Sequence, residues 1–421
     1  MRARTHPAQL VVAGFAAVVA AGTILLMLPV STQGASSASL TTAVFTSTSV
    51  TCVTGLSVVD TATYWSPFGQ VVILALMQIG GFGILTAASL LFLLISKRLG
   101  IRRMLAAQAE TNVLALGDVR RVLLGVLTVT AIVEITTALA LTLRLWLGYG
   151  RAFSEALWEG CFHAVSAFNN VGFSLYSDNL VGFAGDGWFL LPLSLAIIAG
   201  GLGVPVWLEL WRRGRTPARW SLHLKLTMVT SAILLAVGTA AITALEWGNP
   251  ETLGAFGWPG RLLNGFFVSV VSRSAGFNAI DIGRMDPDSW FVVDLLMFIG
   301  GASGSVAGGI KVTTFAVLVM VVWAEILGEP DVSAFGRTVP PAAVRQAFSV
   351  MALSGALVAT ATLALAASSD LDFAQILFET VSAFGTVGLS TGITPLLDDF
   401  GRGVVTALMF IGRVGPVALI G

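Results

Sequence analysis

The chain has 421 residues and no formal net charge, and its composition is 56% hydrophobic but only 11% charged. Ordinary soluble domains are about 25% charged, so the composition excludes a string of soluble domains and indicates an integral membrane protein. The zero net charge argues against nucleic acid as a partner. The two cysteines, Cys52 and Cys161, are too few for a disulfide framework or a metal set.

Eight apolar runs are candidates for membrane-spanning helices, each of which needs roughly 20 apolar residues. In chain order they cover residues 8–30, 67–96, 121–147, 187–211, 223–245, 289–325, 347–368 and 402–421. Within each successive pair of runs lies a segment with a shorter apolar helix, then a phrase rich in Gly, Ser, Thr and Asn, then polar residues. These short helices cannot span a bilayer, so the pattern favours re-entrant segments.

The distribution of Lys and Arg predicts the orientation of the chain in the membrane. With the N-terminus placed in the cytoplasm, 15 of the 23 Lys and Arg residues fall in cytoplasmic segments and 6 in outer segments. The other two, Lys311 and Arg413, lie within apolar runs. This orientation puts all four glycine-rich phrases on the outer side of the membrane.

The glycine-rich phrases are four copies of one pattern, which makes the chain an internal repeat. They read SVTCVTGLS, SAFNNVGFS, VVSRSAGFN and SAFGTVGLS and align on Gly55, Gly172, Gly276 and Gly388. These glycines are 117, 104 and 112 residues apart, and each belongs to a unit of helix, short helix, phrase and helix. The predicted units are residues 1–98, 99–217, 218–328 and 329–421.

Four such phrases solve a problem of backbone hydrogen bonding, because irregular backbone at membrane depth survives only inside protein or beside water. The four segments can surround one axis and present carbonyl oxygens to a cation in place of its water shell. Glycine suits this position because it adopts positive φ at no steric cost. The short helix before each phrase ends near the axis, where its partial negative end favours a cation.

The alternative interpretation is that these glycines mark ordinary helix packing contacts. Packing glycines lie inside spanning helices, whereas the four phrases lie between a short helix and a polar outer segment. We assign the packing interpretation to GGFG (80–83) and GGLG (200–203), which lie within predicted spans and are expected to be packing or kink sites.

Three further motifs are MQIGGFGILT (77–86), FIGGASGSVAGGIKVTTF (298–315) and FIGRVGP (410–416). Together with the four phrases they make the whole chain resemble the Trk/Ktr/HKT superfamily of potassium transporters, and most of all the membrane subunit of Ktr systems. The resemblance implies an all-α integral membrane protein with eight transmembrane helices in four tandem membrane–pore-loop–membrane repeats around one pore.

The resemblance also implies what the chain works with. It implies a homodimer in the lipid bilayer of the cell membrane, and a separate cytoplasmic nucleotide-binding RCK-domain subunit, like KtrA, that gates the pore in trans. K⁺ is then the transported ion, and this chain holds no organic cofactor.

By the same resemblance, four residues of each phrase form a selectivity filter that binds K⁺ at its carbonyl oxygens. These residues are Val53, Thr54, Gly55 and Leu56, then Asn170, Val171, Gly172 and Phe173, then Ser274, Ala275, Gly276 and Phe277, then Thr386, Val387, Gly388 and Leu389. In plant relatives a serine at the first glycine accompanies sodium preference, so Gly55 implies a preference for K⁺.

The apolar run 289–325 is too long for one straight crossing, and its centre, GGASGSVAGGIK (300–311), is a poor helix former. We expect two helical pieces joined by irregular backbone below the filter, as in the broken helices of other transporters. The resemblance implies that this intramembrane loop obstructs the pore and moves on activation. The predicted gate residues are Gly300, Gly301, Ser303, Gly304, Ser305, Gly308, Gly309, Lys311 and Arg413.

The two cations within apolar runs are functional candidates because charge in the membrane is costly. We expect Arg413 to bond carbonyls of the 300–309 loop and to act as a positive barrier to cations. The alternative is a structural Arg413 paired with an acid. Lys311 either snorkels towards the cytoplasm or takes part in gating.

Four other polar residues receive expectations of their own. Asp294 is expected at the membrane interface, and Glu134 lies deeper with no partner that the sequence identifies. His163 is expected to be a hydrogen-bonded residue of the second short helix and not a metal ligand. Asn169 is expected to brace the filter backbone.

Two other classes of function fit the sequence less well. A coupled secondary transporter of a different solute usually shows inverted repeats, whereas these four units share one orientation. A membrane enzyme is disfavoured because the chain has three histidines and no nucleophile–base pairing or metal-binding motif. The sequence leaves open whether Na⁺ is co-transported or only activates transport, and which nucleotide the partner senses.

Overall fold

The computed structural model describes residues 7–34, 36–82, 116–214 and 216–415. The longer helices are α1 (Pro7–Leu26), α4 (Pro67–Gly81), α7 (Leu116–Leu143), α9 (Gly187–Leu202), α10 (Val204–Arg213), α11 (Leu222–Leu245), α13 (Pro287–Phe298), α14 (Val312–Leu327), α15 (Pro341–Ser368) and α17 (Asp399–Val414). The helices that precede the glycine-rich phrases are α2 (Leu40–Thr51), α8 (Phe153–Phe168), α12 (Trp258–Val271) and α16 (Phe373–Gly385). One further turn of helix is α3 (Thr61–Tyr64).

Seven of the helices begin after a polar residue that caps the first free backbone N–H groups. The capping side chains accept from the N–H group two or three residues ahead and come from Ser39, Asp60, Ser66, Asp186, Ser221, Asp372 and Asp398. In α4 the cap is followed by proline at the first helical position, where its fixed φ fits the helix. The helix boundaries are therefore set locally by the sequence.

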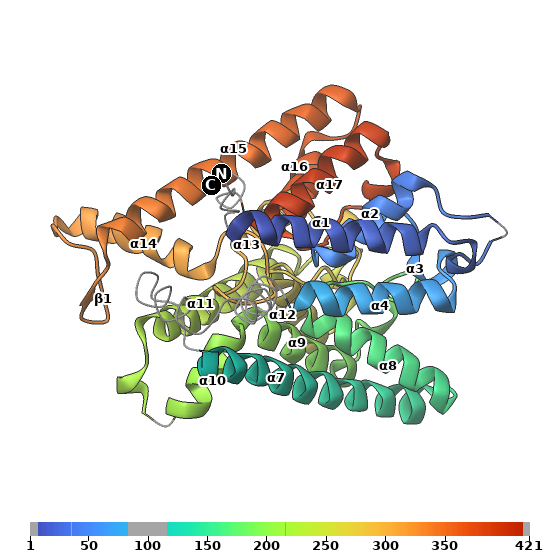
Figure 1. Ribbon diagram of the computed structural model, residues 1–421, viewed down its shortest axis with the longest axis horizontal. Coiled ribbons are helices and arrows are strands. Elements are labelled where there is room, and N and C mark those ends of the chain that lie inside the picture. Colours follow the sequence, from blue (N-terminus) through green and yellow to red (C-terminus); the bar gives the residue numbers. More distant parts are fainter. Residues whose placement is uncertain (1–6, 35, 83–115, 215, 416–421) are drawn as a thin grey trace, which may run out of the picture.

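The helices form four sets that pack around a ring (Figure 1). Four successive sets each consist of a long helix, a short helix and a second long helix: α1, α2 and α4; α7, α8 and α9; α11, α12 and α13; α15, α16 and α17. Neighbouring sets contact each other through α4 with α8, α9 with α12, and α13 with α16. The contact between α17 and α2 closes the circle. The glycine-rich phrases that follow the short helices therefore lie at the centre of the molecule.

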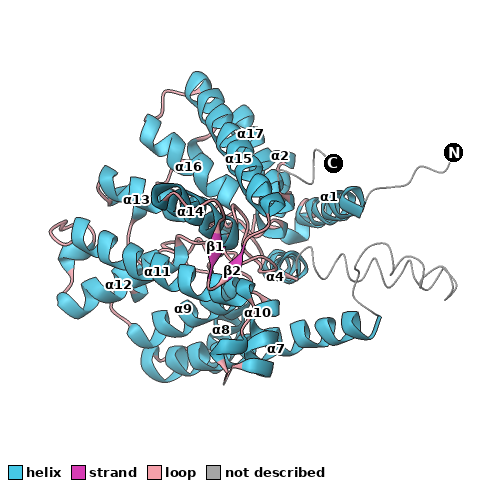
Figure 2. Ribbon diagram, turned by 90° about the vertical axis from the view of Figure 1, so that its left-hand side faces the viewer, coloured by secondary structure: helices cyan, strands magenta, loops and turns pink. Residues whose placement is uncertain are grey.

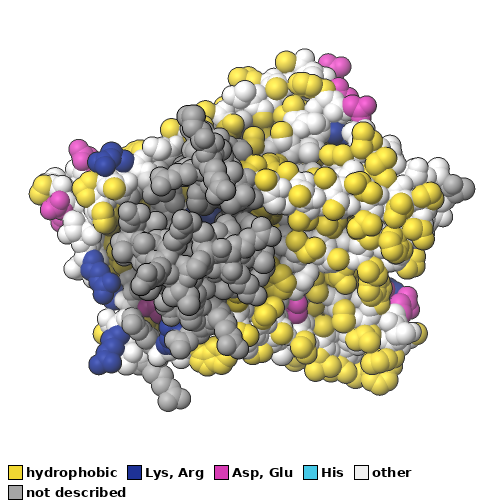
Figure 3. Space-filling model, viewed as in Figure 1, with side chains coloured by type: hydrophobic (Ala, Val, Ile, Leu, Met, Phe, Trp, Pro, Cys, Tyr) yellow, Lys and Arg dark blue, Asp and Glu magenta, His cyan; other side chains and the backbone are white. Residues whose placement is uncertain are grey.

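The surface is largely apolar, as a membrane protein requires (Figure 3). Hydrophobic side chains spread over the middle of this face, above α1, α4, α7 and α8, while Lys and Arg side chains gather at the end where α10 and α14 lie. Large apolar side chains that are more than half exposed include Leu127, Ile135, Leu195, Ile233, Val237 and Leu363. An apolar belt of this extent marks a surface that contacts lipid or another protein.

Three helices in the described part of the chain are long and apolar enough to cross a bilayer: Leu123–Gly148, Leu222–Leu245 and Pro341–Ser368. A fourth crossing results if α9 and α10, bent by 94° at their junction, are counted as one span. The bend lies at Gly203, whose φ of 78° ends α9, so the kink predicted at GGLG is confirmed. The predicted spans 67–96 and 402–421 continue outside the described residues, as do the ends of the motifs at 77–86 and 410–416 and the unit boundary at residue 98.

The fold is mostly helical, as predicted, with one small hairpin that the sequence did not indicate (Figure 2). A small hairpin of β1 (Ser333–Ala334) and β2 (Arg337–Thr338) joins α14 to α15. Its two turn residues, Phe335 and Gly336, have φ of 51° and 73°, the signs that a tight two-residue hairpin turn requires. Strands of two residues leave no alternating pattern, which is why the sequence did not indicate them.

Glycines in the second long helix of three sets allow the short helices to approach closely. A β-carbon on Gly80 would lie 2.2 Å from the carbonyl oxygen of Thr51, the last residue of α2. The corresponding distance is 1.9 Å from Gly200 to the Phe168 oxygen and 2.0 Å from Gly412 to the Phe384 oxygen. The packing role predicted for the glycines of GGFG and GGLG is confirmed at Gly80 and Gly200.

Replacing Gly80, Gly200 or Gly412 with alanine is expected to destabilise the protein by about 1–3 kcal/mol or more, because the new methyl group overlaps a backbone oxygen. Thermal unfolding of the detergent-purified protein, followed by tryptophan fluorescence, measures the change. Gly355→Ala in α15 is the matched control, since its β-carbon would meet no atom within 4 Å and alanine favours helix. Equal unfolding temperatures for the Gly412 variant and this control would contradict the packing role.

Candidate ion-conducting site

The chain leaves each short helix through a segment of four residues, 53–56, 170–173, 274–277 and 386–389, which we name the glycine segments. All of these residues are buried except Gly55 and Gly388, which are partly exposed. The third residue of each has positive φ: 101° at Gly55, 84° at Gly172, 60° at Gly276 and 94° at Gly388. The sequence predicted this use of glycine. It did not predict that the first residue also has positive φ, at 60° in Val53, 55° in Asn170, 145° in Ser274 and 48° in Thr386. Non-glycine residues adopt such conformations only when their surroundings enforce them.

The four glycine segments meet around a common centre. A β-carbon on Gly55 would lie 2.1 Å from the carbonyl oxygen of Val171 in the second segment. The same contact links Gly172 to the Ala275 oxygen at 2.3 Å, Gly276 to the Val387 oxygen at 2.5 Å, and Gly388 to the Thr54 oxygen at 2.1 Å. Each glycine therefore faces a carbonyl of the next segment, and the fourth faces the first. No side chain fits at any of these positions.

A serine six residues before the glycine holds three of the segments. Ser49 Oγ donates to the Leu56 oxygen at 2.7 Å, and Ser166 Oγ donates to the Phe173 oxygen at 2.8 Å. In the fourth segment, Gly388 N donates to Ser382 Oγ at 3.1 Å. The signal was visible in the sequence, because three of the four phrases begin with this serine and the third begins with Val270.

The third segment is accordingly held in a different way. In the other three, the residue before the glycine donates its N–H group to the carbonyl of the serine, at 2.7–2.9 Å. In the third, Ala275 N instead donates to Val271 O at 2.9 Å, and Ser274 has the exceptional φ of 145°. The four-fold pattern of the site is therefore approximate.

The predicted break in the long apolar run is confirmed. Helix α13 ends at Phe298 and α14 begins at Val312, and the residues between them form irregular backbone. The two ends of this loop pair with each other, through Gly300 N to Ile310 O at 2.8 Å and Val312 N to Gly301 O at 3.0 Å. These bonds satisfy backbone groups that the absent helix leaves free.

The loop contacts both the glycine segments and the bend between α9 and α10. A β-carbon on Gly308 would lie 2.2 Å from Thr386 Oγ1, the first residue of the fourth glycine segment. On the other side, Ala302 N donates to Gly201 O at 2.9 Å. The loop therefore joins the fourth glycine segment to the C-terminal end of α9.

Arg413 on α17 is buried and bonds this loop, as the sequence predicted. Its Nη1 donates to the Val306 oxygen, and its Nη2 donates to the Gly80 oxygen at the end of α4. Among the described residues it forms no ion pair with an acid, so the alternative of a paired structural arginine finds no support there. Lys311 folds back and donates to the Ala307 oxygen of the same loop, which does not match the snorkelling expectation.

The structure supplies the missing partners of Glu134 and corrects the expectation for Asn169. Glu134 accepts from Gln78 Nε2 at 3.2 Å and from Asn169 Nδ2 at 3.1 Å, and Asn169 also donates to Gln78 Oε1 at 2.9 Å. Asn169 therefore joins α8 to α4 and α7 and does not bond the filter backbone. The partners are far apart in sequence, so no spacing could have indicated them.

Asp294 is 8% exposed and packed inside the protein.

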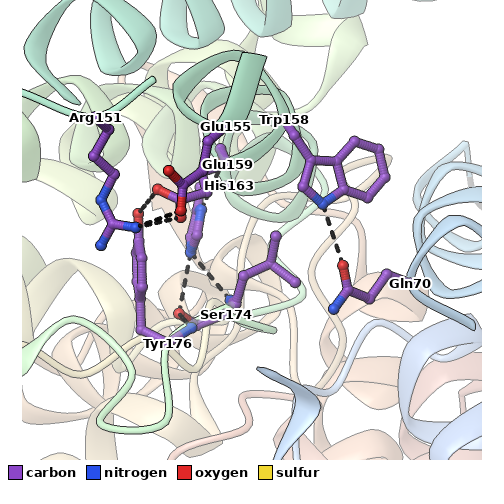
Figure 4. A network of polar contacts seen from close by, with 9 residues as sticks. Gln70, Arg151, Glu155, Trp158, Glu159, His163, Ser174 and Tyr176 are labelled. Atoms are coloured by element: carbon purple, nitrogen blue, oxygen red, sulfur yellow. Dashed lines mark hydrogen bonds and ion pairs between the residues drawn. The ribbon is translucent and has the colours of Figure 1, made fainter. Parts of the chain in front are cut away.

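His163 is a hydrogen-bonded helix residue, as predicted (Figure 4). Its Nε2 lies 3.0 Å from Ser174 Oγ, and its ring stacks on Tyr176 with the ring centroids 4.8 Å apart. Tyr176 in turn donates to Glu159 Oε2 at 2.7 Å, and Arg151 pairs with Glu159 at 2.9 Å. This network braces the stretch that follows the second glycine segment.

The helices, the apolar surface and the central glycine segments define an integral membrane protein of the transporter or channel class. Residues 2–420 match the TrkH family of cation transport proteins, and the chain belongs to that family. It is 38% identical over 417 residues to the Ktr system potassium uptake protein B of Bacillus subtilis, an alignment that covers 99% of this chain and 93% of that protein.

Two further relatives agree with this assignment. The potassium/sodium uptake protein NtpJ of Enterococcus hirae is 34% identical over 424 residues, which cover 100% of this chain and 93% of that protein. The crystal structure of the potassium transporter TrkH from Vibrio parahaemolyticus matches with a TM-score of 0.77 at 17% identity, over 100% of this chain and 85% of that one. The structural match supports the fold.

Gly388→Ala is expected to disrupt the meeting of the glycine segments, because its methyl group would collide with the Thr54 oxygen of the first segment. We expect a lower unfolding temperature and loss of cation transport by the reconstituted protein. Gly392→Ala is the matched control, since Gly392 also has positive φ, 95°, but has no atom within 4 Å of its β-carbon. If both variants lost transport equally, backbone strain would account for the effect and the close approach would not matter.

Proposed function

We propose that the chain is the potassium-translocating membrane subunit of a Ktr-type uptake system in the cell membrane. The single observation that carries the proposal is the set of four glycines whose α-carbons each face a carbonyl oxygen of the next segment. A ring of backbone carbonyls is the chemistry that replaces the water shell of K⁺. The printed functions of the relatives, potassium uptake and potassium/sodium uptake, agree with this ion.

The proposal extends to finer features of the system. The four helix sets are four membrane–pore-loop–membrane units with the N-terminus in the cytoplasm, and residues 53–56, 170–173, 274–277 and 386–389 are the filter. Glycine at position 55 favours K⁺ over Na⁺. The loop 300–311 with Arg413 is the gate, a role supported by the contact of its backbone with the fourth glycine segment and by the guanidinium that bonds it. A nucleotide-binding RCK subunit and a second copy of the chain complete the system.

The proposal is tested by cation flux into liposomes that carry the purified chain, driven by a K⁺ gradient and repeated with Na⁺. We expect K⁺-selective flux, with a variant lacking residues 300–309 giving higher flux in the absence of a partner. Adding Na⁺ at a fixed K⁺ gradient separates activation from co-transport, since only co-transport moves Na⁺ inward with K⁺. No flux of either ion from the folded wild type and the folded deletion variant would overturn the proposal.

Arg413→Ala is expected to raise basal K⁺ flux on the order of tenfold, because two charge-assisted bonds to backbone carbonyls are lost. Arg413→Lys keeps the charge but cannot reach both carbonyls with a planar fork, so its flux should lie between the two. Both variants are compared with wild type in the same liposomes after their unfolding temperatures have been measured. Wild-type flux from a folded Arg413→Ala protein would show that the arginine does not hold the gate.

A further inference from the structure

One position recurs in all four short helices, nine residues before the glycine of the segment that follows. It is occupied by Thr46, His163, Phe267 and Glu379, and all four side chains are fully buried. In the second and fourth helices the side chain reaches the serine two residues after the glycine. His163 Nε2 lies 3.0 Å from Ser174 Oγ, and Ser390 Oγ donates to Glu379 Oε2 at 2.8 Å. These two residues tie a short helix to the backbone that leaves its glycine segment.

The other two copies lack this tie. Thr46 Oγ1 is buried without a hydrogen-bond partner among the described residues, and Ser57 donates to Val59 O instead. In the third copy the position holds a phenylalanine. The position is therefore one place in the repeat where the four copies differ in chemistry.

Glu379 is the member of this set whose side chain can carry a negative charge. The His163 ring is neutral, because Leu175 N donates to its Nε2, which leaves Nδ1 to donate to the Glu159 oxygen. Glu379 accepts from the hydroxyls of Ser390 and Thr394, and no cationic side chain in the described parts of the chain pairs with it. A buried carboxylate without a countercharge is strongly unfavourable. Its partner Ser390 directly follows the fourth glycine segment, so a cation held by the glycine segments is a candidate countercharge.

We propose that Glu379 is a positioning residue whose carboxylate serves as the countercharge for a cation held by the glycine segments, and so sets the affinity for the transported cation. The inference rests on the proposed function. Its two hydroxyl partners, Ser390 and Thr394, tie the carboxylate to the stretch that follows the fourth segment. Because the other three copies of the position are uncharged, the field at the centre is asymmetric and comes from the fourth unit.

The test is K⁺ uptake into liposomes by the full chain, measured over a range of K⁺ concentrations for wild type and Glu379→Gln. The amide keeps the shape and one acceptor oxygen but removes the charge, and its NH2 group faces the other hydroxyl as a donor. We expect the apparent KM for K⁺ to rise about fivefold to tenfold, with the maximal rate changed less than twofold. Glu246→Gln is the matched control, because Glu246 is equally buried but binds Asn249, Thr252 and the backbone of Asp286 away from the glycine segments. The Glu246→Gln control undergoes the same change of group, and its KM should not change.

An unchanged KM in folded Glu379→Gln would overturn the inference. A second pair of variants does not depend on the folding of that protein. Thr46→Asp places a carboxylate at the equivalent position of the first unit and should lower the KM relative to Thr46→Asn, and equal values would also overturn the inference. If instead neither wild type nor the 300–309 deletion variant carries K⁺, the proposed function itself fails, which is a different result.

Discussion

The structure depends on one constraint, which is that backbone polar groups at membrane depth must find partners inside the protein. Each glycine segment meets part of this need locally, through hydrogen bonds back to the end of its own short helix. The carbonyl of the residue before each glycine meets the neighbouring segment, because glycine leaves that space open. Four segments are needed for the contacts to close on themselves. The closed order of helix packing around them follows from this requirement.

The close packing of helix ends against neighbouring helices is a second feature, and it depends on glycine, which has no side chain. The ends of α2, α8 and α16 pack directly on glycines of the helices that follow, so their carbonyl ends are held near the centre of the molecule. A helix end carries a partial negative charge, and three or four such ends at one place favour a cation there. The same glycines that look like ordinary packing sites in sequence therefore position the short helices.

The broken helix connects parts of the chain that are distant in sequence. The guanidinium of Arg413 bonds the loop between α13 and α14 and the end of α4, while Gly308 of that loop lies against Thr386. A shift of the loop would therefore change its contacts with Arg413 of α17 and with the fourth glycine segment, and through Arg413 the contact with α4. Such a shared contact is the physical basis on which a loop movement and the state of the central segments can be coupled.

The sequence by itself determined the membrane class, the four glycines with positive φ, the break between α13 and α14 and the bond from Arg413 to the loop. The first three features follow from local chemistry, since composition and glycine act on their own neighbourhood. The bond from Arg413 to Val306 joins positions 107 residues apart, and it was expected from the place of Arg413 in the fourth repeat. The tertiary structure alone decided the partners of Glu134, the direction of Asn169, the backbone of Val53 and Thr386, and the burial of Glu379 against Ser390 and Thr394. Those features arise from contacts between separate helices or from backbone that its surroundings enforce, and neither has a period or a spacing that a single sequence could reveal.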